Sequence, residues 1–300
     1  MNVLLTSATG YIGGAIAKTL QTNGHPVIGI ARSDASARRL ETAGIQPYRG
    51  DLTDVASLRQ AAQQVEAVIH TAATNDANMA RADQFAVEAL LSALEATNKP
   101  FIYTSGVWVM GDTGETVADE TFPLNPPPIV AWRPAIEDLV LKAVHQGVRS
   151  LVIRPALVYG HGGGLVSMLM KLGQERGTVP IINEGHNTWS FVHLDDLATL
   201  YVKAMEQAPA GTLLLGASGE YLTLRSLALA VAEAAGISPT LQSLTLEEAR
   251  QIWGDLAEAL ALDQRVSGDR AKHLLNWMPS APSLLEELIN GSYQPTAIVA

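Results

Sequence analysis

The first twenty-four residues constrain the fold more than any other segment of the chain. A short apolar run over residues 3–5 is followed by a turn of small and glycine residues over 6–13. Apolar side chains then recur every four residues from Ile12 to Leu20, the spacing of one helical face, until Gly24. A buried strand, a tight turn and a helix in this order are typical of the start of a βαβ unit.

The alternation of strand and helix patterns continues to Pro155. Strands are predicted near residues 27–31, 46–49, 67–70, 101–105 and 150–154, and helical stretches such as 79–97 and 135–145 separate them. Strands that alternate with helices form a parallel sheet covered on both faces. We therefore predict an α/β fold with a doubly wound parallel sheet of the Rossmann type over residues 1–155.

Beyond Pro155 the rhythm of the sequence changes. Gly160 to Gly164 predicts a flexible turn, and helices are predicted near 165–175, 194–206 and 224–235, with several short ones from Leu246 onward. We predict that residues 156–300 form a smaller, mostly helical substrate lobe with segments that return to the core. The proline-rich stretch 119–128 predicts a loop across the carboxyl edge of the sheet, where such folds bind ligands.

Composition excludes several classes of partner. Thirty acidic and twenty basic residues give a net charge of -10, and the basic residues form no cluster, so nucleic acid is not expected as a ligand. No apolar run is long enough for a membrane helix, and the amino-terminal residues lack the pattern of a signal peptide, which predicts a cytoplasmic protein without a membrane partner.

Cysteine and metal chemistry are also not expected. The chain contains no cysteine, which excludes disulfides, thiolate metal sites and cysteine nucleophiles. His186 and His193 have no carboxylate at a convincing ligand spacing, and Asp195 and Asp196 are expected to cap a helix. We predict no metal site.

The turn after the first predicted strand has the residues of a phosphate-binding turn. Gly10 lets the backbone approach a pyrophosphate, and Gly13 lets the helix pack closely on the strand. The helix amino terminus adds amide donors and a positive dipole. The sequence predicts a dinucleotide site that includes the residues Ser7, Thr9, Gly10, Tyr11, Ile12 and Gly13. The alternative is that the turn serves packing alone.

The end of the second predicted strand favours NADP over NAD. An NAD site places an acid here to bind the ribose hydroxyls, but this chain has Ala31 followed by Arg32 and Ser33. Arg32 can pair with a 2′-phosphate and stack on the adenine, Ser33 can donate a hydrogen bond, and Arg38 can add charge. In the alternative interpretation Arg32 is a solvated base at the end of a strand.

With these residues the chain resembles the extended short-chain dehydrogenase/reductases of the NAD-dependent epimerase/dehydratase family. Residues 6–13 are similar to the family's T-G-x-x-G-x-x-G turn, with Ser7 in place of the first glycine. Further matching segments extend the resemblance from residue 1 to the helix near 284–286; they are 51–52, 68–73, 154–155, 159–160 and 191–196. The resemblance implies further coenzyme contacts by Asp51, Leu52, Thr71, Ala72, Ala73, Thr104, Ser105, Arg133 and Pro155.

The family's catalytic residues are not matched. The resemblance places Gly106 at its serine, Ile129 at its tyrosine and Arg133 at its lysine. An alternative register, with Trp132 and Ile136 at the last two positions, restores neither group. Arg133 can hold ribose hydroxyls but does not deprotonate at working pH, and isoleucine transfers no proton. The chain therefore resembles an atypical subgroup without the Ser-Tyr-Lys set.

The predicted substrate is small. Leu157 and Trp189 stand where related nucleotide-sugar enzymes have polar anchors for a diphosphate. We expect a small apolar or aromatic carbonyl compound in a cleft lined by Trp108, Met110, Trp132, Met168 and Trp189. The alternative is that these side chains only fill the core or the lobe interface.

Candidate proton donors are, in order, Tyr159, His161, Ser105 and Tyr103. Each of the first three has its own alternative: Tyr159 recurs as a structural residue in the family, His161 suits a solvated loop, and Ser105 suits a hydrogen bond to the coenzyme or backbone. Glu137 lies four residues after Arg133, which predicts an ion pair along one helix.

Three functions remain open from the sequence. The first is an NADP(H)-dependent oxidoreductase with a non-standard proton donor. The second is a non-catalytic NADP(H) sensor, and the third is an epimerase or dehydratase that retains its coenzyme. By analogy with the fold, a homodimer is possible.

Overall fold

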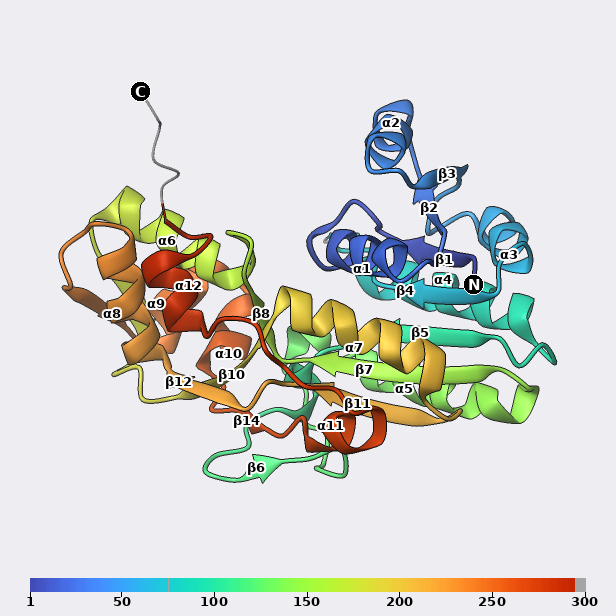
Figure 1. Cartoon of the computed structure of the whole chain (residues 1–300). Coiled ribbons are helices and arrows are strands. Elements are labelled where there is room, and N and C mark those ends of the chain that lie inside the picture. Colours follow the sequence, from blue (N-terminus) through green and yellow to red (C-terminus); the bar gives the residue numbers. More distant parts are fainter. Residues whose placement is uncertain (75, 295–300) are drawn as a thin grey trace.

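Seven parallel strands form the central sheet, in the order β11-β7-β5-β4-β1-β2-β3 (Figure 1). The computed structural model describes residues 1–74 and 76–294. The strands are β1 (Val3–Thr6), β2 (Val27–Ala31), β3 (Gln46–Arg49), β4 (Ala67–His70), β5 (Pro100–Thr104), β7 (Arg149–Pro155) and β11 (Thr212–Gly216). The order reverses at β1, which lies between β2 and β4, and ligands of such sheets bind at the carboxyl ends beside this point.

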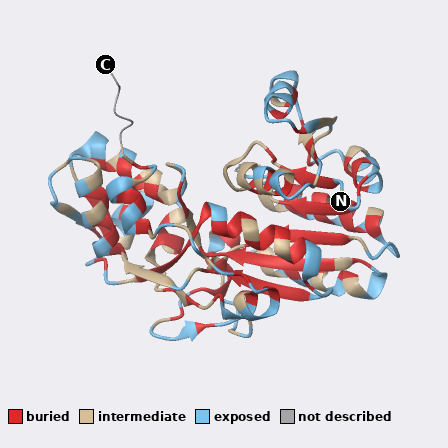
Figure 2. Cartoon of the chain, in the orientation of Figure 1, coloured by how far each residue is buried: buried red, intermediate tan, exposed pale blue. Residues whose placement is uncertain are grey.

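Helices cover both faces of the sheet, as the alternation predicted. One face is covered by α1 (Tyr11–Thr22), α2 (Asp34–Thr42) and α7 (Leu194–Gln207), and the other by α3 (Val55–Gln63), α4 (Met79–Leu94) and α5 (Arg133–Lys142). The strands are four to seven residues long and, except for β3 at one edge, largely buried (Figure 2). The doubly wound α/β prediction is confirmed.

The register of three neighbouring strands aligns polar residues at their carboxyl ends. Thr6 at the end of β1 lies opposite His70 at the end of β4, and His70 lies opposite Tyr103 in β5. Residues opposite one another in a parallel pair point to the same face of the sheet. Thr6, His70 and Tyr103 therefore form a row beneath the ligand-binding edge.

The carboxyl-terminal lobe contains more strands than the sequence patterns predicted. Its strands are β8 (Leu157–Tyr159), β9 (Val179–Ile182), β10 (Thr188–His193), β12 (Glu220–Thr223) and β13 (Leu241–Leu244). Its helices are α6 (Gly164–Arg176), α8 (Leu224–Ala234), α9 (Leu246–Trp253), α10 (Leu256–Ala261) and α12 (Leu284–Asn290), in Figure 1 mostly at the left. Both β12 and β13 are four residues long and partly polar, so their patterns are too short to show a period.

Later segments return to the core. Helix α7 and strand β11 complete one face and one edge of the sheet, and α11 (Asp269–Leu275) packs beside them. The short strands β6 (Val117–Ala118) and β14 (Arg265–Val266) pair with each other, and short 3₁₀ turns cover Val107–Met110, Pro128–Val130 and Ala143–Gln146. None of the helices in the described segments is both long enough and apolar enough to span a bilayer.

The start of α7 differs from the prediction. His193, rather than Asp195 or Asp196, caps the helix, because its Nδ1 accepts the Asp195 amide at 3.1 Å. The Asp196 carboxylate instead accepts the amides of Ser280 and Ala281. Asp196 thus ties the segment before α12 to the core helix.

Candidate functional site

The turn between β1 and α1 has the shape of a phosphate cradle. Ser7 adopts a left-handed backbone conformation with φ 57°, and its carbonyl accepts the Gly10 amide at 2.8 Å. Helix α1 begins at Tyr11 with Gly10 as its cap residue and no side chain capping it. The first amides of α1 therefore remain available to an anionic ligand.

Gly13 packs so closely on the turn that its backbone leaves no room for a side chain. A Cβ there would lie 2.2 Å from the Ser7 carbonyl oxygen, whereas a Cβ on the neighbouring Gly14 would meet only the Ala8 oxygen at 3.7 Å. We expect Gly13→Ala to lower the free energy of unfolding by about 1–3 kcal/mol through overpacking. The matched control Gly14→Ala should raise it by about 0.5–1 kcal/mol. Urea unfolding measures both, and equal effects would contradict the close packing described here.

The end of β2 carries an exposed arginine and a serine whose hydroxyl already caps a helix. Arg32 is exposed, whereas Ser33 caps α2 by accepting the Ser36 amide at 3.2 Å. The amide of Thr53 and its hydroxyl hold the pKa of Asp51 below its ordinary value, and the charge of Arg32 adds to this effect. The predicted adenosine contacts Arg32 and Asp51 therefore lie within electrostatic reach of each other, and Leu52 beside them is buried.

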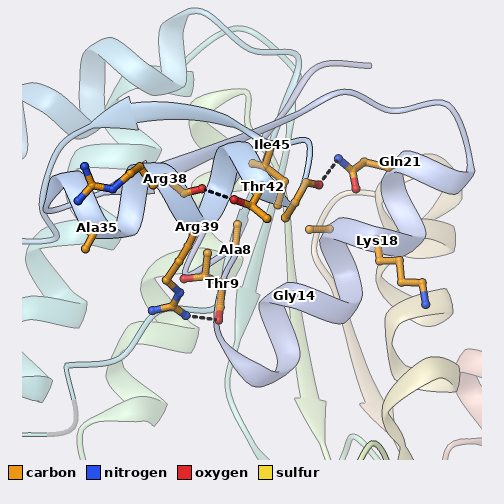
Figure 3. A pocket seen from close by; sticks show the side chains of 12 residues that line it. Ala8, Thr9, Gly14, Lys18, Gln21, Ala35, Arg38, Arg39, Thr42 and Ile45 are labelled. Carbon is orange, nitrogen blue, oxygen red and sulfur yellow. Dashed lines mark hydrogen bonds between the residues drawn. The ribbon is translucent and has the colours of Figure 1, made fainter.

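A cavity of about 790 Å³ lies between α1 and α2 (Figure 3). Arg39 reaches back from α2 to the Thr9 carbonyl at 3.1 Å, and Arg38 extends from the same helix in another direction. Lys18 of α1 also lines the cavity, and none of the described lining residues is acidic. The predicted phosphate turn is thus bordered by basic side chains.

The carboxyl end of β4 is tied to the end of β1. The Thr6 hydroxyl accepts the amides of Thr71 at 3.0 Å and Ala72 at 3.1 Å, and the Thr71 hydroxyl donates to the Thr6 carbonyl at 2.6 Å. Having accepted two amides, the Thr6 hydroxyl donates its own proton to His70 Nδ1 at 3.0 Å. The predicted residues Thr71 and Ala72 are thereby fixed beside the turn, and exposed Ala73 follows them.

A buried carboxylate missed by the sequence analysis organises the floor of the site. Asp83 of α4 bonds His70 Nε2 at 3.1 Å, and its second oxygen accepts the Tyr103 hydroxyl at 2.6 Å and the Trp132 indole N–H at 3.1 Å. Burial opposes its ionisation, but the hydrogen bonds to His70 and Tyr103 and the charge of Arg133 outweigh it and lower the pKa of Asp83. A charged residue within the apolar face of the 79–94 helix is the signal that identifies it.

Arg133 lies at the start of α5 and is fixed by this network. Its Nη1 donates to the Thr104 carbonyl at 2.8 Å and contacts the Tyr103 hydroxyl at 3.4 Å. The guanidinium carbon lies 5.4 Å from the centre of the Trp132 ring. The predicted residue Thr104 has its hydroxyl bonded to Tyr201 and offers only its carbonyl to Arg133.

A cleft of about 280 Å³ lies between the turn at residues 6–13 and Arg133. The polar side chains among its lining residues are Tyr11, Ser105 and Arg133, and predicted residues Ile12 and Pro155 line it as well. Tyr11 donates its hydroxyl proton to the Gly160 carbonyl at 2.8 Å. The Ser105 hydroxyl is buried and has no hydrogen-bond partner among the described residues. The Ser105 hydroxyl is therefore an unpartnered polar group at the cleft.

Two of the candidate proton donors lie outside this cleft. Tyr159 donates to the Pro282 carbonyl at 2.9 Å and the Glu220 carboxylate at 3.2 Å, inside the lobe. His161 is exposed and bonds the Asp195 carboxylate at 2.9 Å. Neither lines the cavity, and of the first three candidates only Ser105 does.

Tyr103, the remaining candidate, is buried beneath the cleft. Its hydroxyl proton is donated to Asp83. Burial raises the pKa of Tyr103, and Asp83 adds to this effect, although the Arg133 charge opposes it. Tyr103 therefore serves the network rather than a ligand.

The aromatic and methionine side chains divide between cleft and core. Trp108 lines the cleft, whereas Met110 is fully buried in the core beside the sheet. Trp189 is buried in the lobe and donates to the Leu260 carbonyl at 3.2 Å, and Met168 packs against the same lobe core. Trp132 binds Asp83 instead of lining the cavity. For Met110, Met168 and Trp189 the alternative of core packing is the one that the structure favours.

The expected pair between Arg133 and Glu137 is wrong. Glu137 is buried against the sheet and accepts Arg154 of β7, at 3.0 Å from Nε and 2.5 Å from Nη2. Arg133 points instead to the end of β5. Arg133 and Glu137 do lie four residues apart on one helix, but spacing along a helix cannot reveal a partner on the sheet beneath α5.

The glycine loop 160–164 is held from two sides. Tyr11 bonds Gly160 from the turn at residues 6–13, and the Tyr293 hydroxyl accepts the Gly160 amide and donates to the Gly163 carbonyl at 2.7 Å. Burial raises the pKa of Tyr293 to about 12, so this hydroxyl stays protonated near neutral pH. The loop wall of the cleft is thus anchored to both the core and the end of α12.

Known proteins are similar to this chain in sequence and in fold. A sequence model of the NAD dependent epimerase/dehydratase family matches residues 3–216. An uncharacterized protein of Schizosaccharomyces pombe, C2A9.02, is 32% identical over 98% of this chain and 100% of its own length. A 4-hydroxy-2-methyl-3-oxo-4-farnesyl-3,4-dihydroquinoline-1-oxide ketoreductase of Stigmatella aurantiaca is 25% identical over 83% of this chain and 78% of its own.

A solved structure supports the same fold. The UDP-glucose 4-epimerase of Thermus thermophilus, in complex with NAD, superposes with a TM-score of 0.80 at 21% identity and covers 98% of this chain and 99% of its own. The match of the family model to most of the chain, together with the changed catalytic positions, settles the assignment. The chain belongs to the NAD-dependent epimerase/dehydratase family, as an atypical member of the short-chain dehydrogenase/reductase oxidoreductases.

Proposed function

We propose that the protein is an NADP(H)-dependent oxidoreductase that acts on a small carbonyl compound with an apolar or aromatic body. The observation that carries this proposal is the cleft of about 280 Å³ between the turn at residues 6–13 and Arg133, which is lined by Ser105 with its unpartnered hydroxyl. The ketoreductase among the relatives acts, by its name, on a ketone. Carbonyl reduction is therefore the chemistry that we assign to this cleft.

The residues around the turn fit a dinucleotide. The uncapped start of α1 suits a pyrophosphate, and a side chain at Gly13 would close the turn against Ser7. Arg32, with Arg38 nearby in sequence, suits a 2′-phosphate, and Asp51 and Leu52 border the adenine position. Arg133 is available to the ribose or substrate at the redox end.

The chain's own groups position and polarise the substrate. When bound, the coenzyme supplies a hydride. Ser105 can donate a hydrogen bond to a carbonyl oxygen in an apolar cleft, where such a bond is stronger than in water. Burial raises the pKa of Tyr11, whose proton is already donated to Gly160, and arginine does not deprotonate at working pH. The proton that accompanies reduction therefore comes from water, either directly or relayed through the Ser105 hydroxyl.

Loss of the Ser105 hydroxyl tests this function. We expect the full chain to oxidise NADPH with at least one class in a panel of ketones, enones and imines, and Ser105→Ala to lower kcat by about 10²-fold. Ser150→Ala is a matched control, because this buried serine also lacks a hydrogen-bond partner among the described residues but lies at the amino end of β7. Absence of turnover with every class would contradict the proposal, as would equal kcat for the two variants.

An NADP(H) sensor is a second candidate, favoured by one observation. The hydrogen bond from Tyr11 to the Gly160 carbonyl connects the coenzyme turn directly to the glycine loop of the lobe. Coenzyme binding that moves this turn would also shift the loop, and a partner protein would recognise the loop in its shifted position. Tight coenzyme binding without turnover, with a partner affinity that depends on the coenzyme's redox state, would favour this candidate over the enzyme.

A further inference from the structure

We propose that the cleft binds its substrate through a carboxylate held by Arg133, so that the preferred substrates are small oxo acids with an apolar body. This inference rests on the proposed function and names its substrate class. It depends on the charge of Arg133, on the geometry that fixes it, and on the polar and apolar lining around it.

The positive charge of Arg133 has no partner in the cleft. No carboxylate of the described residues forms an ion pair with it, and no acidic residue is among those that line the cavity. The nearest acid in the network, Asp83, bonds the Tyr103 hydroxyl, which stands between them. In a chain of net charge -10, an unpaired guanidinium facing an apolar cleft favours an anionic ligand.

Arg133 is also fixed before any ligand arrives. Its Nη1 is held by the Thr104 carbonyl and Tyr103, and the Trp132 ring lies beside it, itself fixed by Asp83. Nε and Nη2 have no hydrogen-bond partner among the described residues and remain for a ligand. Two adjacent N–H groups on one planar guanidinium match the two oxygens of a carboxylate.

Ser105 supplies a second and separate anchor. It follows Thr104, the residue that binds Arg133, and it is one of the residues that line the same cavity; its buried hydroxyl has no partner among the described residues. The rest of the lining is mainly apolar and includes Ile12, Trp108, Val130, Leu157, Val158 and Leu165. A ligand with a carboxylate at Arg133, a carbonyl oxygen at Ser105 and an apolar body satisfies all three features.

The test compares an acid with its amide of nearly equal shape. Benzoylformate and benzoylformamide are titrated into the full chain by calorimetry, with and without NADP⁺. We expect the acid to bind about 10- to 100-fold more tightly, the fold-change for a hydrogen-bonded charge. Arg133→Gln should abolish the difference in affinity. Arg133→Lys keeps the charge but loses the two parallel N–H donors of the guanidinium, and it should retain part of the difference.

Arg81→Gln is the control variant. Arg81 lies on α4, away from the cleft lining, with its guanidinium 5.1 Å from the Phe85 ring centre, and its loss should leave the acid-to-amide ratio unchanged. Equal affinities of acid and amide for the unaltered chain would overturn the inference. It is also overturned if Arg133→Gln weakens NADP⁺ binding while the ratio persists, because Arg133 then serves the ribose.

These outcomes are separate from those of the proposed function. Failure to turn over any carbonyl compound would contradict the oxidoreductase. The ratio of acid affinity to amide affinity is measured by binding alone and therefore tests only the carboxylate site. Turnover of neutral ketones with no preference for the acid would support the oxidoreductase and overturn the carboxylate site.

Discussion

Glu137→Ala is expected to lower the free energy of unfolding by about 3–5 kcal/mol, because it leaves Arg154 as an uncompensated charge inside the protein. Both side chains are almost fully buried, and they share hydrogen bonds at 3.0 Å and 2.5 Å between α5 and β7. The Nη1 of Arg154 already lacks a partner among the described residues, so no second acceptor compensates for the loss. Urea unfolding of the full chain measures the change.

Two further variants show whether the buried pair causes this loss. Asp138→Ala removes the adjacent carboxylate, which is exposed and paired with Lys142, and should cost at most about 1 kcal/mol. Replacing the pair by apolar residues, Glu137→Leu with Arg154→Met, should recover much of the stability lost in Glu137→Ala. If Glu137→Ala lowers the free energy of unfolding no more than Asp138→Ala does, the buried pair does not contribute the stability that its burial indicates.

Arg32→Glu is expected to reverse the preference of the protein for phosphorylated coenzyme. The guanidinium at the end of β2 is exposed, and losing a charge-assisted bond to a 2′-phosphate weakens NADPH binding by about 10- to 100-fold. The introduced carboxylate also repels the phosphate and can accept ribose hydroxyls. NADH affinity should therefore stay constant or rise, and calorimetry with both coenzymes measures the ratio.

Arg49→Gln is the matched control for this change. Arg49 is an exposed arginine at the end of the neighbouring strand β3, and it is paired with Asp34. Its removal should leave the ratio of NADPH to NADH affinity unchanged. If the ratio of NADPH to NADH affinity is the same in Arg32→Glu as in the unaltered chain, Arg32 is only a solvated base and does not bind the 2′-phosphate.

The sequence predicted the core of the fold because each of its elements carries a local signal. The apolar run 3–5, the turn glycines and the helical face from Ile12 to Leu20 all lie within one segment, and the sheet repeats that unit. The lobe was predicted less well. Its strands β12 and β13 are four residues long, and pairing with distant strands determines them more than their own composition does.

The candidate site was predictable where residues act through the backbone and less so where they act through distant partners. The turn residues and Arg133 lie at the cleft or beside it. The partners of Glu137 and Trp132 come from other elements, Arg154 in β7 and Asp83 in α4, and no spacing along the chain shows them. Trp189 packs in the lobe core because its face of β10 points there, and the sequence alone does not show which face does so.

Calorimetric titration of the full chain with NADPH and with NADH tests the central claim most directly. If the turn at residues 6–13 and Arg32 hold a 2′-phosphorylated dinucleotide, NADPH should bind with measurable heat and at least about tenfold more tightly than NADH. Absence of heat with both coenzymes would contradict the coenzyme site, and tighter binding of NADH would contradict the assignment of Arg32.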